Sequence, residues 1–193
     1  MKTRKKWTMA LCGLLAVIMA LLTGCVSSQT GSSTPTEEKD VVEGSGSWVY
    51  YTFEEAVKEA DVIVYGTAGE RGETKVREGT EGESSLDYYR EIPITVKEVV
   101  KGEDSETVAY KEYGGETDDT IYRVLDFDPL ESGKDYILFL HEDGFSLPPY
   151  TLLLVEDGIV HTTNVPDSAL DENGEAPESI PVDDYIAMIQ EAM

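Results

Sequence analysis

The chain has 193 residues and carries 39 aspartates and glutamates against 15 lysines and arginines, a formal net charge of −24 at pH 7. This length suffices for one domain with a sizeable hydrophobic core. The acidic excess excludes binding to nucleic-acid phosphates, which requires clustered basic residues, and favours cations, basic proteins or uncharged ligands as partners. The two cysteines, Cys12 and Cys25, precede the predicted domain, which therefore has no disulfide and no thiol for catalysis or metal binding.

Residues 1–24 have the composition of a secretory signal peptide. A basic head precedes an apolar run that starts at Met9, and the run ends in the box Leu22-Thr23-Gly24-Cys25. This order resembles the lipobox of bacterial lipoproteins. The resemblance implies cleavage between Gly24 and Cys25 and a diacylglycerol thioether on Cys25, so that the lipid bilayer is a partner through this anchor alone. The alternative is an uncleaved transmembrane helix, but the apolar run is shorter than the roughly 20 residues that a span requires.

Residues 25–47 are rich in Ser, Thr, Gly and Glu and contain few large apolar side chains. Such a segment buries too little surface to offset its chain entropy. The composition predicts a flexible tether that connects the lipid to a folded domain spanning 48–193. The expected location is the extracytoplasmic side of the cell membrane.

The predicted domain begins with a helix. Thr52 and Glu55 have the spacing of a capping box, and Phe53 and Val57 lie on one face of the helix that follows. A second helix is predicted over 181–193, again with one apolar face.

Strands are predicted between the two helices. The segment 88–100 alternates apolar and polar residues, and Pro93 within it indicates an edge or a bulge. Asp157-Gly158 between two apolar runs is a strong signal for a hairpin. The predicted strands are 62–68, 88–100, 107–113, 121–125, 135–140 and the two arms of the hairpin within 151–162.

This set of elements predicts a mainly β fold, a small antiparallel barrel or rolled sheet built from five to six of these strands. Strands that are apolar on both faces need cover outside the barrel as well as within it. The two terminal helices are the candidates for that cover.

A second resemblance rests on the strings FEEAVKEADVIVYGTA, IPITVKEVVKGE and SGKDYILFL. They are similar to the oligonucleotide/oligosaccharide-binding (OB) core of netrin-like modules, a group that includes the tissue inhibitors of metalloproteinases. The resemblance implies an OB-like barrel. It does not imply inhibition, because those inhibitors bind a catalytic zinc through an amino-terminal cysteine held by disulfides, and here the only mature cysteine is the predicted lipid site.

Acidic residues at alternating positions are typical of calcium-binding loops. Asp126, Asp128 and Glu131 form one such pattern and the segment 171–175 forms another, but neither completes a calcium loop of the EF-hand type. Such partial motifs arise by chance in so acidic a chain. We therefore predict no metal, with Asp126, Asp128 and Glu131 as the weak candidates, and no cofactor.

The two histidines offer a second route to a metal site. His141 and His161 both end apolar strands, so that the two together with Glu142 could bind a metal at one rim of the barrel. The alternative is that both are ordinary polar residues at strand ends. No nucleophile elbow, Ser/His/Asp set or phosphate-binding glycine loop occurs in the sequence, so no enzyme is predicted and a secreted hydrolase is the last alternative.

Tyrosines gather near the predicted strand ends at positions 50–51, 88–89, 110 and 113. Barrels of the OB class bind oligosaccharides on one face, so a cell-wall glycan-binding module is one hypothesis; alternatively these tyrosines belong to the core and its rim. The main hypothesis is a membrane-anchored, non-catalytic module that binds an extracytoplasmic protein or ligand.

The variant Cys25→Ala tests the lipid anchor. Because the sulfur of Cys25 is the predicted acylation site, the variant should incorporate no labelled lipid and should accumulate as the uncleaved precursor. Metabolic labelling with a radioactive fatty acid measures the incorporation of lipid, and electrophoretic mobility of the protein distinguishes the precursor from the cleaved chain. Labelled lipid on the alanine variant would contradict the assignment.

Overall fold

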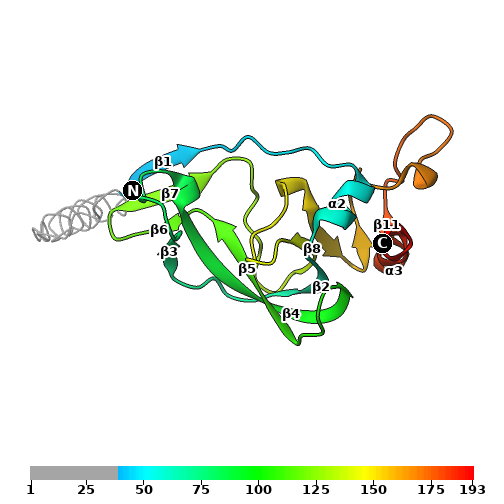
Figure 1. Cartoon of the computed structure of the whole chain (residues 1–193), viewed down its shortest axis with the longest axis horizontal. Helices are drawn as coiled ribbons and strands as arrows, with labels where there is room; N and C mark the ends of the chain where they lie inside the picture. Colours follow the sequence, from blue (N-terminus) through cyan, green and yellow to red (C-terminus); the bar gives the residue numbers. More distant parts are fainter. Residues whose placement is uncertain (1–38) are drawn as a thin grey trace, which may run out of the picture. The chain divides into compact units, whose positions relative to one another are not determined.

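A computed structural model describes residues 39–193, which form two β-sheets and two α-helices (Figure 1). The mainly β class predicted from the sequence is confirmed; the signal peptide, Cys25 and the first part of the tether lie outside the described residues. In chain order the elements are β1 (Asp40–Gly44), α2 (Phe53–Glu59), β2 (Val62–Ala68), β3 (Thr74–Val76), β4 (Tyr88–Lys101), β5 (Thr107–Tyr113), β6 (Gly115–Glu116), β7 (Thr120–Val124), β8 (Asp135–Leu140), β9 (Leu152–Glu156), β10 (Ile159–Val160), β11 (Ile180–Pro181) and α3 (Val182–Ala192). Short 3-10 helices lie at Ser85–Asp87, Pro149–Thr151 and Asp167–Ala169.

Strand β4 connects the parts of the larger sheet. The strand order is β11-β10-β9-β8-β2-β4-β3, and β5 pairs with the opposite edge of β4. On the first edge, β2 pairs with 94–101 and β3 with 88–90. Pro93 lies between these two stretches, where Gly69 N donates to its carbonyl at 2.8 Å. A proline is tolerated here because its missing N–H faces the gap between two partner strands.

The sheets do not close into the expected barrel. Closure requires a continuous ladder along the outer edge of β5, whereas this edge forms one isolated bridge, between Lys111 and Phe145. The segment that reaches β5 turns at Gly144, whose φ is +88°, and Gly144 O accepts a hydrogen bond from Lys111 N at 2.8 Å. After the turn the chain bonds back to β8 and to the residue that follows it: Leu147 N donates to Phe139 O at 3.0 Å, and His141 N donates to Phe145 O at 2.8 Å. The segment therefore follows β8 and leaves β5 after one bridge, so the larger sheet stays open.

The smaller sheet, of order β1-β7-β6, shows that the folded part begins earlier than predicted. Residues 40–44 pair in parallel with 120–124, and Lys39 forms an ion pair with Glu116 at 2.8 Å. The last part of the expected tether is therefore a strand. Its composition concealed this because β1 is stabilised by a partner far away in the sequence, which a local pattern does not reveal.

Two hydrophobic clusters cover opposite faces of the central strands, which explains why these strands are apolar on both faces. Ile137 and Phe139 of β8 pack in the cluster that contains both helices, whereas Leu138 and Leu140 pack with residues of β4 on the other face. The helices thus provide cover on the first face.

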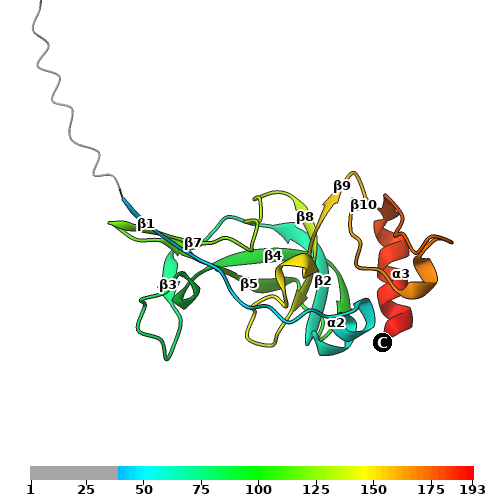
Figure 2. The ribbon, with the colours of Figure 1, turned by 90° about the horizontal axis from the view of Figure 1, so that it is seen from above.

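The two helices lie together at the opposite end of the domain from β1 (Figures 1 and 2). Helix α2 begins at the predicted capping box: Thr52 Oγ1 accepts a hydrogen bond from Glu55 N at 3.3 Å, and Glu55 Oε2 accepts one from Thr52 N at 2.9 Å. Phe53 meets Tyr185 of α3 edge to face, with ring centroids 5.8 Å apart. Neither helix of the described chain has the length and apolar character that crossing a membrane demands.

The turn between β9 and β10 confirms the predicted hairpin. Asp157 and Gly158 both have positive φ, 51° and 78°. A type I′ turn requires this conformation at both central residues, and an Asp-Gly pair adopts it readily.

Removing β1 is expected to destabilise the domain. A chain that starts at Ser47 lacks the five residue pairs between β1 and β7, and each net hydrogen bond contributes about 1 kcal/mol. We expect its free energy of unfolding to lie at least ~2 kcal/mol below that of a chain starting at Lys39. Urea denaturation of both chains measures the difference, and equal values would show that β1 adds nothing to the fold.

Candidate ligand-binding site

The buried carboxylate of Glu112, on β5, joins three segments on one side of the domain. Its side chain is 3% exposed and accepts hydrogen bonds from Arg71 Nε and Arg90 Nη2, both at 2.8 Å, and from Leu130 N at 2.9 Å. The bond to Glu112 also raises the pKa of Arg71. The loop after β2, strand β4 and the loop before β8 are thereby fixed to one side chain.

The segment between β1 and α2, residues 45–52, is an extended strap that crosses the domain from one end to the other (Figures 1 and 2). One end is held by Asp126. Its Oδ2 accepts a hydrogen bond from the indole N–H of Trp48 at 3.0 Å and another from the backbone N–H of Gly46 at 2.9 Å. The other end is held by the hydroxyl of Tyr150, which accepts a hydrogen bond from Tyr51 N and donates one to Val49 O. The strap is therefore ordered by side chains, without a ladder of its own.

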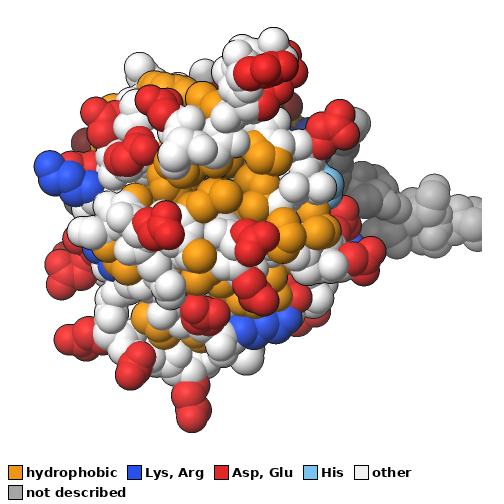
Figure 3. Space-filling view, turned by 90° about the vertical axis from the view of Figure 1, so that its right-hand side faces the viewer, with side chains coloured by type: hydrophobic (Ala, Val, Ile, Leu, Met, Phe, Trp, Pro, Cys, Tyr) orange, Lys and Arg blue, Asp and Glu red, His pale blue; other side chains and the backbone are white. Residues whose placement is uncertain are grey.

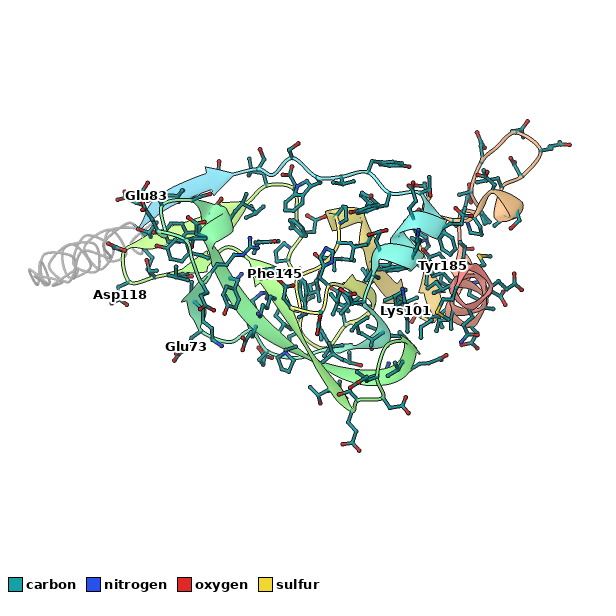
Figure 4. All side chains as sticks on the ribbon, in the orientation of Figure 1. Glu73, Glu83, Lys101, Asp118, Phe145 and Tyr185 are labelled. Carbon is teal, nitrogen blue, oxygen red and sulfur yellow. The ribbon has the colours of Figure 1, made fainter. Side chains whose placement is uncertain are left out.

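Four aromatic side chains from distant parts of the chain meet at the strap. Trp48 contacts Phe127 edge to face at 4.9 Å and Tyr113 at 5.8 Å, and Tyr113 stacks on Phe145 at 4.5 Å. The two phenylalanines are buried, whereas Trp48 and Tyr113 are half-buried. Figure 4 places Phe145 in the middle of the domain, away from the helical end that Tyr185 marks. The cluster thus presents two partly exposed aromatic rings over a buried base.

Tyr113 lines two surface grooves. The first, which we call the aromatic groove, has a volume of about 270 Å³ and is lined by Ser47, Trp48, Val49, Tyr51, Arg77, Tyr113, His141, Asp143, Phe145, Ser146, Leu147 and Pro148. The second groove, of about 340 Å³, is lined by Arg90, Glu112, Tyr113, Gly115, Glu116, Ile121, Tyr122, Arg123, Val124, Leu125, Phe127 and Pro129.

The two grooves differ in how their charges are paired. Every charged residue that lines the second groove takes part in an ion pair. In the aromatic groove, Arg77 forms no ion pair within residues 39–193, and its guanidinium carbon lies 5.2 Å from the centroid of the Phe145 ring. Burial raises the pKa of the Tyr113 phenol, while the positive charge of Arg77 acts in the opposite direction. The aromatic groove therefore holds a cation that has no ion-pair partner within residues 39–193.

The hydroxyl of Ser146 is buried in the wall of the aromatic groove, and that of Tyr110 is buried beneath the wall. Neither has a well-formed hydrogen bond within the described residues. Burial raises the pKa of Tyr110, and the nearby Ser146 hydroxyl opposes this. The phenol of Tyr110 stays protonated at neutral pH, and Ser146, which lines the groove, contributes a neutral polar group to the wall.

The predicted calcium ligands are not brought together. Asp126 is engaged by the strap, and Asp128 and Glu131 are exposed in the loop that follows. The carboxylate of Asp171 likewise bonds within its own turn, where it accepts hydrogen bonds from Asn173 N and Glu175 N. The part of the chain that the structure describes contains no group of three or more His, Cys, Asp or Glu side chains that could hold a metal ion.

The two histidines have different neighbours. His141 Nδ1 lies 3.9 Å from a carboxylate oxygen of Asp61, and His161 Nδ1 lies 3.1 Å from the carbonyl of Glu178. The joint metal site with Glu142, which the sequence offered as one alternative, is therefore not formed among the described residues, because the two histidines contact different residues.

The predicted tyrosines lie in different parts of the structure. Tyr110 is fully buried, Tyr113 lines both grooves, and Tyr88 stacks on Tyr122 at 3.7 Å. Tyr50, 79% exposed, lies on the outside of the strap. Tyr113 thus belongs to the aromatic cluster at the strap, Tyr89 contacts Phe145 of that cluster edge to face at 5.5 Å, and Tyr51 lines the aromatic groove.

The residues of the aromatic groove that were not predicted include Trp48, Arg77 and Phe145. Trp48 marked only the expected start of the domain, although a large aromatic residue directly after a polar segment is itself a signal of docking. Arg77 lies in the segment 69–86, which is rich in glycine and glutamate, and Phe145 lies in a turn. No local pattern places these residues together.

No protein-family model, curated protein or solved structure matches this chain. The resemblances to bacterial lipoproteins and to netrin-like modules therefore stay predictions. Function has to be inferred from the residues of the site.

The variant Asp126→Ala tests how the strap is held. Trp48 is the only tryptophan outside residues 1–24, so its fluorescence reports on the strap. Loss of the hydrogen bond to the indole should shift the emission to longer wavelength and lower the free energy of unfolding by about 1–2 kcal/mol. Asp128→Ala is the matched control, because this exposed carboxylate does not bond to the strap. If the two variants behaved alike, Asp126 would not hold Trp48.

Proposed function

We propose that this chain is a lipid-anchored, extracytoplasmic module that binds a glycan in the aromatic groove and carries out no chemistry. The anchor is supported by the box Leu22-Thr23-Gly24-Cys25 and by the basic and apolar segments that precede it. Cell-wall glycan is the polymer that such a module meets outside the membrane.

The observation that carries the glycan assignment is the pair of half-exposed rings, Trp48 and Tyr113, beside a groove that also contains polar side chains. Sugar rings have apolar C–H faces and polar edges, so they pair well with an aromatic face flanked by hydrogen-bonding groups. Pockets with this mixture are the usual form of small-ligand sites. The Asp126 and Tyr150 contacts hold the strap, so one wall of the groove is ordered before a ligand arrives.

Binding without catalysis fits the polar groups in the groove. The Asp143 carboxylate accepts a hydrogen bond from Phe145 N at 3.1 Å, and His141 faces Asp61 at 3.9 Å. Glycoside hydrolysis needs two carboxyl groups facing each other across the scissile bond, and Asp143 is the one carboxylate among the groove's lining residues.

A second candidate is a module that binds a protein. It is favoured by the hydrophobic side chains that gather in the centre of the face at the helical end, with acidic side chains around them (Figure 3). A flat apolar surface of this kind is typical of protein–protein contacts.

The variant Tyr113→Leu separates the two candidates. Leucine keeps apolar volume beside Trp48 but removes the flat ring, so affinity for wall glycan fragments should fall about tenfold or more. Soluble fragments released by a muramidase are titrated against residues 39–193 while Trp48 fluorescence is followed, and melting curves show that the variant is folded. Tyr50→Leu is the control, because this exposed tyrosine is not a lining residue of the aromatic groove. Absence of glycan binding, together with retention of a protein partner, would favour the second candidate.

A further inference from the structure

Two cations without ion-pair partners meet at one aromatic ring. Among the lysines and arginines of residues 39–193, the side chains of Lys58, Arg77 and Lys111 form neither an ion pair nor a hydrogen bond. Lys58 lies exposed on α2. The other two converge on Phe145, with Arg77 Cζ at 5.2 Å and Lys111 Nζ at 5.4 Å from the ring centroid.

Lys111 belongs to the same side of β5 as the aromatic groove. Successive side chains of a strand point to opposite faces, so Lys111 and Tyr113 share one face. The burial pattern agrees, because both are half-buried while Tyr110 and Glu112 are buried. Lys111 also lies over the ring of Tyr89 at 5.3 Å. The cation–π contacts orient both cations without neutralising their charge.

This placement is unexpected in a chain with 39 acidic residues and 15 basic ones. Like charges repel, so two neighbouring cations are destabilising unless an anion lies between them or nearby. Asp143, the one acidic lining residue, accepts a hydrogen bond from Phe145 N and forms no ion pair with Arg77 or Lys111 within residues 39–193. The two cations at the Phe145 ring therefore outnumber the one carboxylate of the groove.

We propose that the ligand of the aromatic groove is an anionic glycan, whose sugar ring stacks on Tyr113 and whose carboxylate or phosphate pairs with Arg77 and Lys111. This inference rests on the proposed function. Guanidinium and ammonium groups form the strongest hydrogen bonds of proteins with carboxylate and phosphate oxygens. The groove, at about 270 Å³, lies near the lower end of ligand-pocket volumes, which suits a single charged sugar unit. The second groove is not the anion site, because its arginines are already paired.

The experiment uses residues 39–193 and three preparations of muramidase-released wall glycan fragments. The first is native, the second has its carboxylates converted to neutral amides, and the third has been freed of phosphate by hydrofluoric acid. Isothermal titration calorimetry measures the dissociation constant of each preparation for the wild-type chain and for Arg77→Gln, Lys111→Gln and Lys58→Gln. The last variant removes an equally unpaired charge outside the groove, and melting curves verify that all variants are folded.

We expect native fragments to bind, and Arg77→Gln and Lys111→Gln each to weaken binding about tenfold, while Lys58→Gln leaves it unchanged. Amidation abolishes this binding if carboxylates are recognised, and hydrofluoric acid abolishes it if phosphates are. If native fragments bind but neither treatment and neither groove variant weakens them, the anionic ligand is wrong and the glycan-binding function stands. If no preparation binds, both proposals fail.

Discussion

The interaction on which the candidate site depends is the burial of the Glu112 carboxylate. Taking a charge out of water costs several kcal/mol, and the structure tolerates it only where every hydrogen bond is satisfied. Two arginines and the backbone of Leu130 satisfy it here. Because the third donor lies in the loop between β7 and β8, the carboxylate also fixes the loop that carries Asp126. That aspartate holds Trp48, so the order of the strap depends on a charge buried in β5.

The electrostatics of this chain act at two ranges. The net charge of −24 produces a long-range field that favours solubility and repels polyanions. At physiological ionic strength this field decays over about 8 Å, so recognition at contact distance is governed by the nearest groups. Arg77, which lines the aromatic groove, and Lys111, which lies over the Phe145 ring of that groove, supply those groups. An acidic exterior combined with a small cationic site favours ligands that insert one charged unit and disfavours extended anionic surfaces.

Local elements were predictable from the sequence and long-range pairings were not. The capping box at Thr52 and the Asp157-Gly158 turn follow from chemistry within a few residues, and both are found as predicted. Strand β1 and the open sheet depend on partners far away in the sequence, Thr120–Val124 and Phe145. The same limit applies to the site. Tyr113 was one of several tyrosines noted in the sequence, and its neighbours come from the strap, from a loop rich in glycine and glutamate and from a turn, which only the tertiary fold brings together.

The strap determines how well the aromatic groove is prepared for a ligand. Tyr113 belongs to β5 and Phe145 is tied to β5 by an isolated bridge, so the base of the groove has the rigidity of a sheet. Trp48 has no such ladder, and its position rests on contacts from Asp126 and Tyr150 to the strap. Because this wall is ordered before a ligand binds, binding does not include the entropic cost of ordering the wall. The two contacts therefore contribute to affinity although neither side chain has to touch the ligand.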